Sequence, residues 1–204
     1  MEREAIPAAT RADLRVEELR GARLLDALDA IAALRIAVFR DWPYLYDGDR
    51  DYEARYLAAY AAPGALCVAV WHGTEMVGAS TGAPMTDHAE DFAAALPPDW
   101  AVEDVFYCAE SVLLPGYRGL GLGHAFFDRR EAAARAQGLR RAVFASVLRP
   151  ADHPARPADY RPLDPFWVAR GYAKLPGAVA RFAWKDVGAA EESEKPLQLW
   201  GRVL

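Results

Sequence analysis

Apolar residues recur along this chain with two periods, and the changes between the periods mark the expected elements. Within 23–39 they follow one another at steps of three and four, which predicts an amphipathic helix. The runs 65–71 and 75–80 are almost continuously apolar, and the His-Gly-Thr segment at 72–74 between them is typical of a hairpin turn. The chain therefore combines helices with a sheet.

The same patterns give the order of elements over the whole chain. We expect strand 14–20, helices 23–39 and 51–61, strands 65–71, 75–80 and 105–114, a helix from 122 up to Gly138, strand 142–148, helix 165–170, strand 179–184, a charged linker at 188–195 and strand 197–203. A short alanine-rich helical piece within 85–104 should stop at Pro97 and Pro98. Four prolines in 149–164 predict an unusually long loop. This order predicts a mixed α/β (α+β) sheet rather than a regular βαβ array.

Composition indicates one soluble globular unit, which we take as a single domain over 1–204 with a core of about 14–203. The chain is 53% hydrophobic and 26% charged, and no apolar run approaches the roughly 18 residues that a bilayer span needs. Its first ten residues are acidic and do not resemble a secretory signal. We therefore expect a cytoplasmic protein that binds no membrane.

Charge and cysteine usage exclude several classes of function. The net charge of -5 argues against a nucleic-acid binder, which would need a basic face. Any anionic ligand must therefore be bound by a local group of donors rather than by an overall positive charge. Cys67 and Cys108 lie in apolar runs and are expected to be buried, reduced thiols. The four histidines are scattered at spacings that match no common metal motif, so no metal is expected.

The segment 118–123, Arg-Gly-Leu-Gly-Leu-Gly, follows an apolar strand and opens a helix. Amides in a first helical turn have no partner within the helix, and the helix dipole adds positive potential there. Glycines remove the Cβ atoms that would keep phosphate oxygens at a distance. The spacing does not fit the dinucleotide fingerprint, because His124 or Phe126 stands where its third glycine belongs, and no Gly-Lys-Ser/Thr closes a nucleotide P-loop.

The spacing fits the pattern [Q/R]-x-x-G-x-[G/A], filled by Arg118, Gly121 and Gly123 after a strand and Pro115. With the helix and strand that follow, and with Phe-Trp-Val-Ala-Arg-Gly-Tyr at 166–172, the chain resembles the GNAT N-acetyltransferase superfamily from about 14 to 203, most closely over 105–172. The resemblance implies a central sheet of about seven strands with helices on both faces. It also implies that the strands before and after the glycine segment splay apart around acyl-CoA.

The resemblance further implies that acetyl-CoA is the co-substrate and an amine of a small molecule or protein the acceptor. The pantetheine arm would bond to backbone of Ser111, Val112 and Leu113, one of whose amides would stabilise the oxyanion. The pyrophosphate would lie on amides of Gly119, Leu120, Gly121, Leu122, Gly123 and His124. Arg118 would supply charge or brace the turn, and the alternative for it is a solvated surface charge.

Glu110 matches a strand position that in this family often carries a general base, acting directly or through water. A salt bridge or a contact that orients substrate is the alternative. Trp167 stands where many members have a tyrosine that protonates the thiolate; Tyr172, Tyr160 or water are the possible replacements, and none is assigned.

Trp42, Tyr44, Tyr46 and Tyr160 are candidate acceptor contacts, with loop packing as their alternative. The loop that holds Arg149, Asp152, His153, Tyr160 and Arg161 either covers the cleft or is a rigid surface loop. The leading hypothesis is an acetyltransferase, monomeric or homodimeric. A catalytically silent acyl-CoA-binding module is the second hypothesis, and a nicotinamide enzyme is disfavoured by the failed fingerprint.

Overall fold

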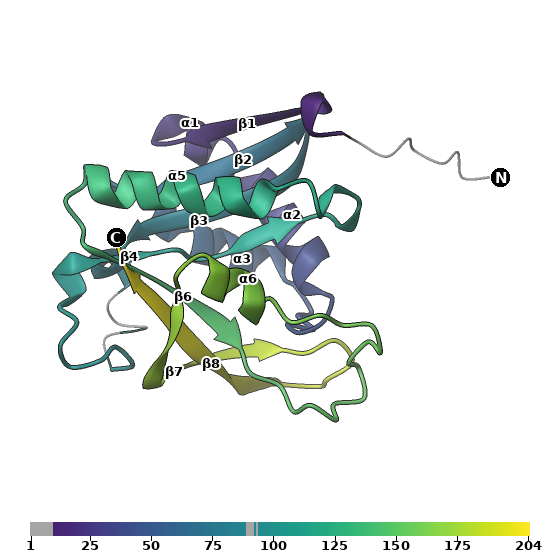
Figure 1. The fold of residues 1–204 in the computed structure, drawn as a ribbon. Coiled ribbons are helices and arrows are strands. Elements are labelled where there is room, and N and C mark those ends of the chain that lie inside the picture. Colours follow the sequence, from purple (N-terminus) through teal and green to yellow (C-terminus); the bar gives the residue numbers. More distant parts are fainter. Residues whose placement is uncertain (1–9, 89–91, 93) are drawn as a thin grey trace.

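The strands of this chain form one open sheet, which confirms the expected mixed α/β architecture (Figure 1). The structure, a computed structural model, describes residues 10–88, 92 and 94–204. Within them the sheet has eight strands: β1 (Leu14–Leu19), β2 (Leu66–His72), β3 (Glu75–Pro84), β4 (Val105–Tyr107), β5 (Ser111–Leu113), β6 (Arg141–Val147), β7 (Ala173–Lys185) and β8 (Glu192–Val203). The order is β1-β2-β3-β4-β6-β8-β7, with β5 paired to β3. The β4–β6 pair is parallel and the other pairs are antiparallel.

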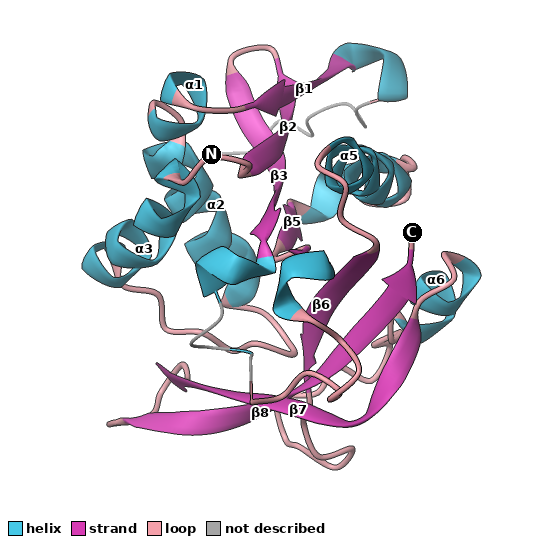
Figure 2. Cartoon of the chain, turned by 90° about the vertical axis from the view of Figure 1, so that its left-hand side faces the viewer, coloured by secondary structure: helices cyan, strands magenta, loops and turns pink. Residues whose placement is uncertain are grey.

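Helices cover both faces of the sheet, as expected (Figure 2). On one face lie α1 (Ala22–Leu25), α2 (Leu28–Phe39) and α3 (Arg50–Leu57), and on the other lie α5 (Leu122–Ala136) and the short α6 (Asp164–Ala169). β2 shows why both faces are covered, because its side chains alternate between two apolar cores. Cys67 and Ala69 pack in the core of α1 to α3, whereas Leu66, Val68 and Val70 pack in the core of α5.

Several boundaries differ from the pattern-based expectation. The helix expected over 23–39 is divided into α1 and α2, and the helix expected over 51–61 ends as a 3-10 turn at Ala58–Ala61. The expected linker 188–195 is wrong for its second half, because β8 already begins at Glu192 and pairs with β7 in a long hairpin. Glu192, Ser193 and Glu194 are exposed, whereas Lys195 is buried, with Nζ 2.9 Å from the carbonyl oxygen of Trp184.

Two further expectations concern segments that are described only in part. The helical piece expected within 85–104 falls partly on residues 89–91 and 93, and the N-terminal segment on residues 1–9, all outside the described residues. Among the described residues, no helix is both long enough and apolar enough to span a membrane. Cys67 and Cys108 are free and buried, and burial raises the pKa of both thiols, that of Cys67 to about 12.

The strand expected over 105–114 is interrupted between β4 and β5. The amide of Ala109 donates to the carbonyl of Thr81 (3.1 Å), and the amide of Thr81 donates to the carbonyl of Glu110 (3.2 Å). Two residues therefore oppose one residue of β3, which is the pattern of a β-bulge. Before the bulge, Cys108 still donates to Val143 of β6 (2.8 Å). Beyond it β5 pairs with β3 and β6 pairs with β8, so the two strands part.

A buried arginine holds this bulge from the α5 face. Arg130 is 1% exposed, and its Nη1 donates to the carbonyls of both Thr81 and Glu110 at 3.2 Å. Its Nη2 donates to Oγ of Ser111 at 3.0 Å. Hydrogen bonds from an ionised donor are the stronger kind, so the guanidinium fixes both sides of the break.

A second buried arginine reaches the same residue from the α2 face. Arg35 lies with Nη1 2.7 Å from Oε2 of Glu110 and Nε 2.5 Å from Oε2 of Glu53 in α3. Burial opposes the charge of Arg35, but the carboxylates of Glu110 and Glu53, with Tyr56, outweigh it and hold the Arg35 pKa well above its usual value. Its guanidinium also stacks over the ring of Tyr56, 4.3 Å from the centroid. We call Arg35, Glu53 and Glu110 the buried triad.

The triad leads to a stability prediction that a double-mutant cycle tests. Arg35→Met removes the cation and leaves two buried carboxylates uncompensated, which should lower the free energy of unfolding by about 3–5 kcal/mol. Glu53→Gln alone should also destabilise. The double variant should lose less than the sum of the two losses, because without Arg35 the change at Glu53 removes an unpaired charge instead of breaking an ion pair. Urea unfolding of the four proteins measures this, and strictly additive losses would show that the two residues are not coupled.

Candidate functional site

The glycine turn has the backbone conformation that an anion site at a helix start requires. Gly119 and Gly121 have φ of 79° and 73°, in the left-handed region that favours glycine, and Gly121 is the N-cap of α5. A Cβ at either position would meet no atom within 4 Å, so open space lies over the turn. The N-cap provides no side-chain hydrogen bond, and the amides of the first turn remain available. This arrangement suits a phosphate group.

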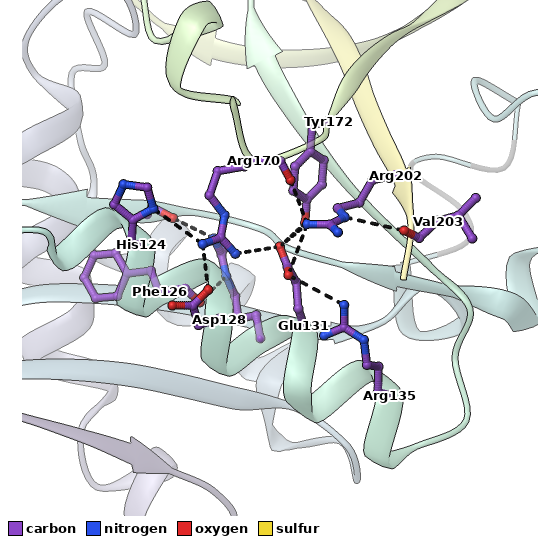
Figure 3. A network of polar contacts seen from close by, with 11 residues as sticks. His124, Phe126, Asp128, Glu131, Arg135, Arg170, Tyr172, Arg202 and Val203 are labelled. Atoms are coloured by element: carbon purple, nitrogen blue, oxygen red, sulfur yellow. Dashed lines mark hydrogen bonds and ion pairs between the residues drawn. The ribbon is translucent and has the colours of Figure 1, made fainter. Parts of the chain in front are cut away.

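Gly123 has a different role, because it allows α6 to approach the start of α5. A Cβ there would lie 3.2 Å from the ring of Phe166. The end of α6 and strand β8 are held to α5 by a network around the buried carboxylate of Glu131 (Figure 3). Arg170 contacts Glu131 at 3.0 Å and Arg202 contacts it at 3.3 Å. The network therefore supports the wall beside the glycine turn, where His124 also packs edge-on against Phe166.

Arg118 is exposed and braces the turn against β5, one of the roles expected for it. Its Nε donates to the carbonyl of Leu113 over 3.4 Å. Because Arg118 is exposed and lies three residues before Gly121, the N-cap of α5, it adds a positive charge close to the start of that helix in the chain.

β5 presents one backbone edge to the gap between the parted strands. The amide of Leu114 donates to Val77 and the carbonyl of Glu110 accepts from Thr81, so the even-numbered residues face β3. In an antiparallel pair the groups of the intervening residues point the other way. The N–H and C=O groups of Ser111 and Leu113 therefore face the gap, whereas those of Val112 bond to β3.

At the end of this gap, on the α2 and α3 face, lies a pocket of about 610 Å³ including its open mouth. Its walls come from the bulge (Ala109 and Glu110), β6, the β7–β8 hairpin, α2 and α3, and the loop after α2. Glu110 is 5% exposed and uses Oε2 to contact Arg35. Its other oxygen, Oε1, receives no hydrogen bond from any described residue. Glu110 therefore lines the pocket with one carboxylate oxygen that still has no donor among the described residues.

The four candidate acceptor residues divide into two pairs. Tyr44 and Tyr46 line the pocket, and burial raises the pKa of both, that of Tyr44 to about 12. Trp42 and Tyr160 are not among the residues that line it; their rings contact each other with centroids 5.9 Å apart, and Trp42 also contacts His153. The proline-rich loop is therefore packed on the loop after α2, outside the pocket wall.

Arg149 anchors this packing. Its guanidinium donates to the carbonyls of Pro43 and Tyr44 and forms a bidentate pair with Asp186 at 2.7 and 2.8 Å. Burial would raise the pKa of Asp186, but Arg149 and Lys195 together hold it below its usual value. The loop that carries Tyr44 into the pocket is thus fixed by a residue more than a hundred positions away in sequence.

The residues considered for thiolate protonation do not line the pocket. Trp167 packs against Phe144 and Trp200, with centroids 4.9 and 5.1 Å away. The hydroxyl of Tyr172 donates to Glu131 at 3.2 Å, and the residue is buried. Tyr160 lies against Trp42. The hydroxyl-bearing side chains of the pocket wall are instead Tyr44, Tyr46, Tyr52, Tyr56 and Tyr107.

Sequence reasoning missed the two buried arginines and Glu53. A signal for them exists in the helical spacing. Arg35 lies four residues from both Ile31 and Phe39, and Arg130 lies four residues from both Phe126 and Ala134, so each cation occupies the apolar stripe of its helix. A charged residue in such a stripe needs a buried partner, although the spacing does not reveal which one.

Comparisons with known proteins agree with this geometry. Residues 30–158, more than half of the chain, match the family model described as the acetyltransferase (GNAT) family. No curated protein matches the chain significantly in sequence.

Similar solved structures include the ribosomal-protein-alanine N-acetyltransferase of Brucella melitensis (TM-score 0.59, 12% identity, covering 93% of this chain and 99% of that one). An N-acetyltransferase from Staphylococcus aureus has a TM-score of 0.57 and 13% identity, with 93% of this chain and 98% of that one covered. An aminoglycoside 6'-N-acetyltransferase complexed with coenzyme A has a TM-score of 0.58 and 13% identity, with 93% of this chain and 96% of that one covered. At these identities the structures show a shared fold. With the match to the family model, they establish that this chain belongs to the GNAT acetyltransferase family.

Proposed function

We propose that this protein transfers an acetyl or other short acyl group from acetyl-CoA to an amine, by direct attack of the amine in a ternary complex. Three features support the proposal: a glycine turn at the start of α5 that suits an anion, a backbone edge of β5 that pairs with no strand of the described chain, and a buried carboxylate with one oxygen that has no donor among the described residues. They follow one another along the gap between the parted strands, in the order that an acyl-CoA molecule and its acceptor need.

The residues present fit acyl-CoA. The amides from Gly119 to His124 would hold the pyrophosphate, where neither Gly119 nor Gly121 has a neighbour that would exclude it. The outward backbone groups of Ser111 and Leu113 would hold the pantetheine amides in the manner of an added strand. Their amides are also the groups available to stabilise the oxyanion.

The transfer requires an amine without its extra proton. An alkylamine has a pKa of about 10.4, so deprotonating it at pH 7 costs about 4.6 kcal/mol. Glu110 would accept that proton through Oε1; the support for this role is that Arg35 contacts Oε2, whereas Oε1 has no donor among the described residues. The amine then forms the amide bond as the thioester C–S bond breaks. Its second proton leaves with the thiolate, which gives the CoA thiol.

The first prediction tests the anion site with a matched pair of variants. Asp and Asn both tolerate the left-handed backbone of position 121 better than other side chains, and each finds open space there. Gly121→Asp should weaken acetyl-CoA binding by about a hundredfold or more, because it places a negative charge against the phosphates. Gly121→Asn should weaken it far less. Calorimetry on both folded variants decides, and equal affinities would remove the pyrophosphate from this turn.

A second prediction concerns ligand class and turnover. Acetyl-CoA at about 100 times its dissociation constant should stabilise the protein by roughly 2.7 kcal/mol, whereas NADH should not. Thermal unfolding with each ligand measures this, and a shift with NADH alone would contradict the proposal. CoA release with an amine panel then separates an enzyme from a silent acyl-CoA-binding module, since the module would show the thermal shift without turnover.

A third prediction concerns the proton acceptor. Glu110→Gln keeps the shape of the side chain but removes the acceptor, so kcat should fall by about 10² to 10⁴ with acetyl-CoA affinity almost unchanged. The acidic limb of the pH–rate profile should flatten. Acceptors with a lower amine pKa should recover part of the rate, because less proton removal is needed.

Glu53→Gln is the matched control for this experiment. It removes the same charge from contact with Arg35, but Glu53 is not among the residues that line the pocket. It should lower stability while the folded enzyme keeps its pH profile. If Glu110→Gln behaves like Glu53→Gln, the carboxylate of Glu110 is structural and the proton leaves by another route.

A further inference from the structure

The pocket beside Glu110 is built mainly from aromatic rings. Eight of its thirteen lining residues are aromatic, and they come from α2, the loop after it, α3, β4 and β7: Phe39, Tyr44, Tyr46, Tyr52, Tyr56, Tyr107, Phe182 and Trp184. Many of these rings contact one another. Tyr52 and Tyr56 stack with an interplanar angle of 8°, and Tyr44 packs on Trp184 with centroids 5.9 Å apart. The walls therefore offer mainly ring faces and edges, with the hydroxyl groups of five tyrosines among them.

The tyrosine hydroxyls add no negative charge to this pocket. Burial raises the pKa of Tyr44 to about 12 and also raises that of Tyr46, Tyr56 and Tyr107. These groups are therefore neutral at physiological pH. The rings can nevertheless hold a cation, because the guanidinium of Arg35 already lies 4.3 Å from the centroid of Tyr56.

The charges at the pocket floor favour a cationic guest. Arg35 is the only basic side chain among the described residues that line the pocket, and two carboxylates engage it. One arginine and two glutamates leave the buried triad with a formal charge of -1. Glu110 lines the pocket, and its Oε1 is buried and has no donor among the described residues. An ammonium group would donate a hydrogen bond to this oxygen and would also balance the formal charge of the buried triad.

The same charges disfavour an anionic group beside the amine. A carboxylate in the acceptor would lie near Glu110, and the one cation at hand is already neutralised by Glu53 and Glu110. Leaving such a charge buried and unpaired is costly. The aromatic walls likewise favour an acceptor whose body packs on rings, since eight of the thirteen lining residues offer ring surface.

We infer that the acceptor is a small primary amine with an aromatic or similarly apolar body and no carboxylate next to the amine, an arylalkylamine being the best fit. This inference rests on the proposed function for its chemistry, but its recognition step can be measured by binding alone. The ammonium would lie against Oε1 of Glu110 and the apolar body against the rings of the α3 and β7 walls.

Matched amines test the inference by turnover. 2-Phenylethylamine and phenylalanine share the ring and the amine and differ by one carboxylate, while ethanolamine keeps the amine and lacks the ring. We expect kcat/KM for 2-phenylethylamine to exceed both by about a hundredfold or more. An aminoglycoside and a peptide with an N-terminal alanine complete the panel. Faster turnover of phenylalanine, ethanolamine, the aminoglycoside or the peptide would overturn the inference and leave the proposed acetyl transfer intact.

Binding without acetyl-CoA separates the inference from the proposed function. Calorimetry should show 2-phenylethylamine binding at least about tenfold more tightly than 2-phenylethanol, because only the amine carries the charge. Glu110→Gln should abolish that preference, whereas Glu53→Gln should retain it; melting curves confirm that each variant is folded. Preferential binding with no turnover of any amine supports the pocket assignment and refutes the enzyme. Equal binding of amine and alcohol by the unaltered protein, or no binding of either, overturns the inference.

Discussion

The arrangement depends on one constraint: the bulge at Ala109 and Glu110 must hold its shape while its two neighbouring strands separate. Two buried arginines, which come from opposite faces of the sheet, hold the bulge in shape by binding the same residue, Glu110. Arg130 from α5 donates to the carbonyl of Glu110, and Arg35 from α2 contacts its carboxylate. The carbonyl also accepts from Oγ of Ser80 at 3.0 Å and from the amide of Thr81. With this many partners, the backbone at the break has little freedom to relax into a continuous strand.

The two buried arginines, Arg130 and Arg35, have different structural roles. Arg130 adds a charged donor to two carbonyls at the point where the ladder is disrupted, and the described chain shows no carboxylate paired with it. Arg35 instead joins three elements through charge, since α2, α3 and the bulge each supply one member of the buried triad. A buried ion pair contributes little net stability compared with apolar packing, but it strongly penalises any arrangement that separates its members. The triad therefore specifies where Glu110 lies more than it strengthens the fold.

The parts of this fold that sequence predicts well are those set by neighbouring residues. The glycine turn, the start of α5 and the alternation in β2 follow from local spacing and from backbone angles that only certain residues adopt. The buried triad and the clamp of Arg130 do not, because their partners are distant: Arg35 and Glu53 are 18 positions apart, and Arg130 and Thr81 are 49. The long final hairpin is also hard to predict, because paired strands that project into solvent tolerate charges that resemble a linker.

The gap between the parted strands is electrically asymmetric, and under the proposed function this asymmetry would let an acidic protein bind an anionic co-substrate. At the α5 end, positive potential comes from backbone amides and the exposed Arg118, so it needs no excess of basic residues. At the pocket end, the triad carries a surplus carboxylate inside aromatic walls, where low polarity strengthens its field. An anion and a cation entering from opposite ends would each meet the charge that attracts it and be repelled from the other end. In the proposed reaction, the polarity of the gap would set which reactant occupies which half, and the reactive groups would meet at the bulge that Arg35 and Arg130 hold.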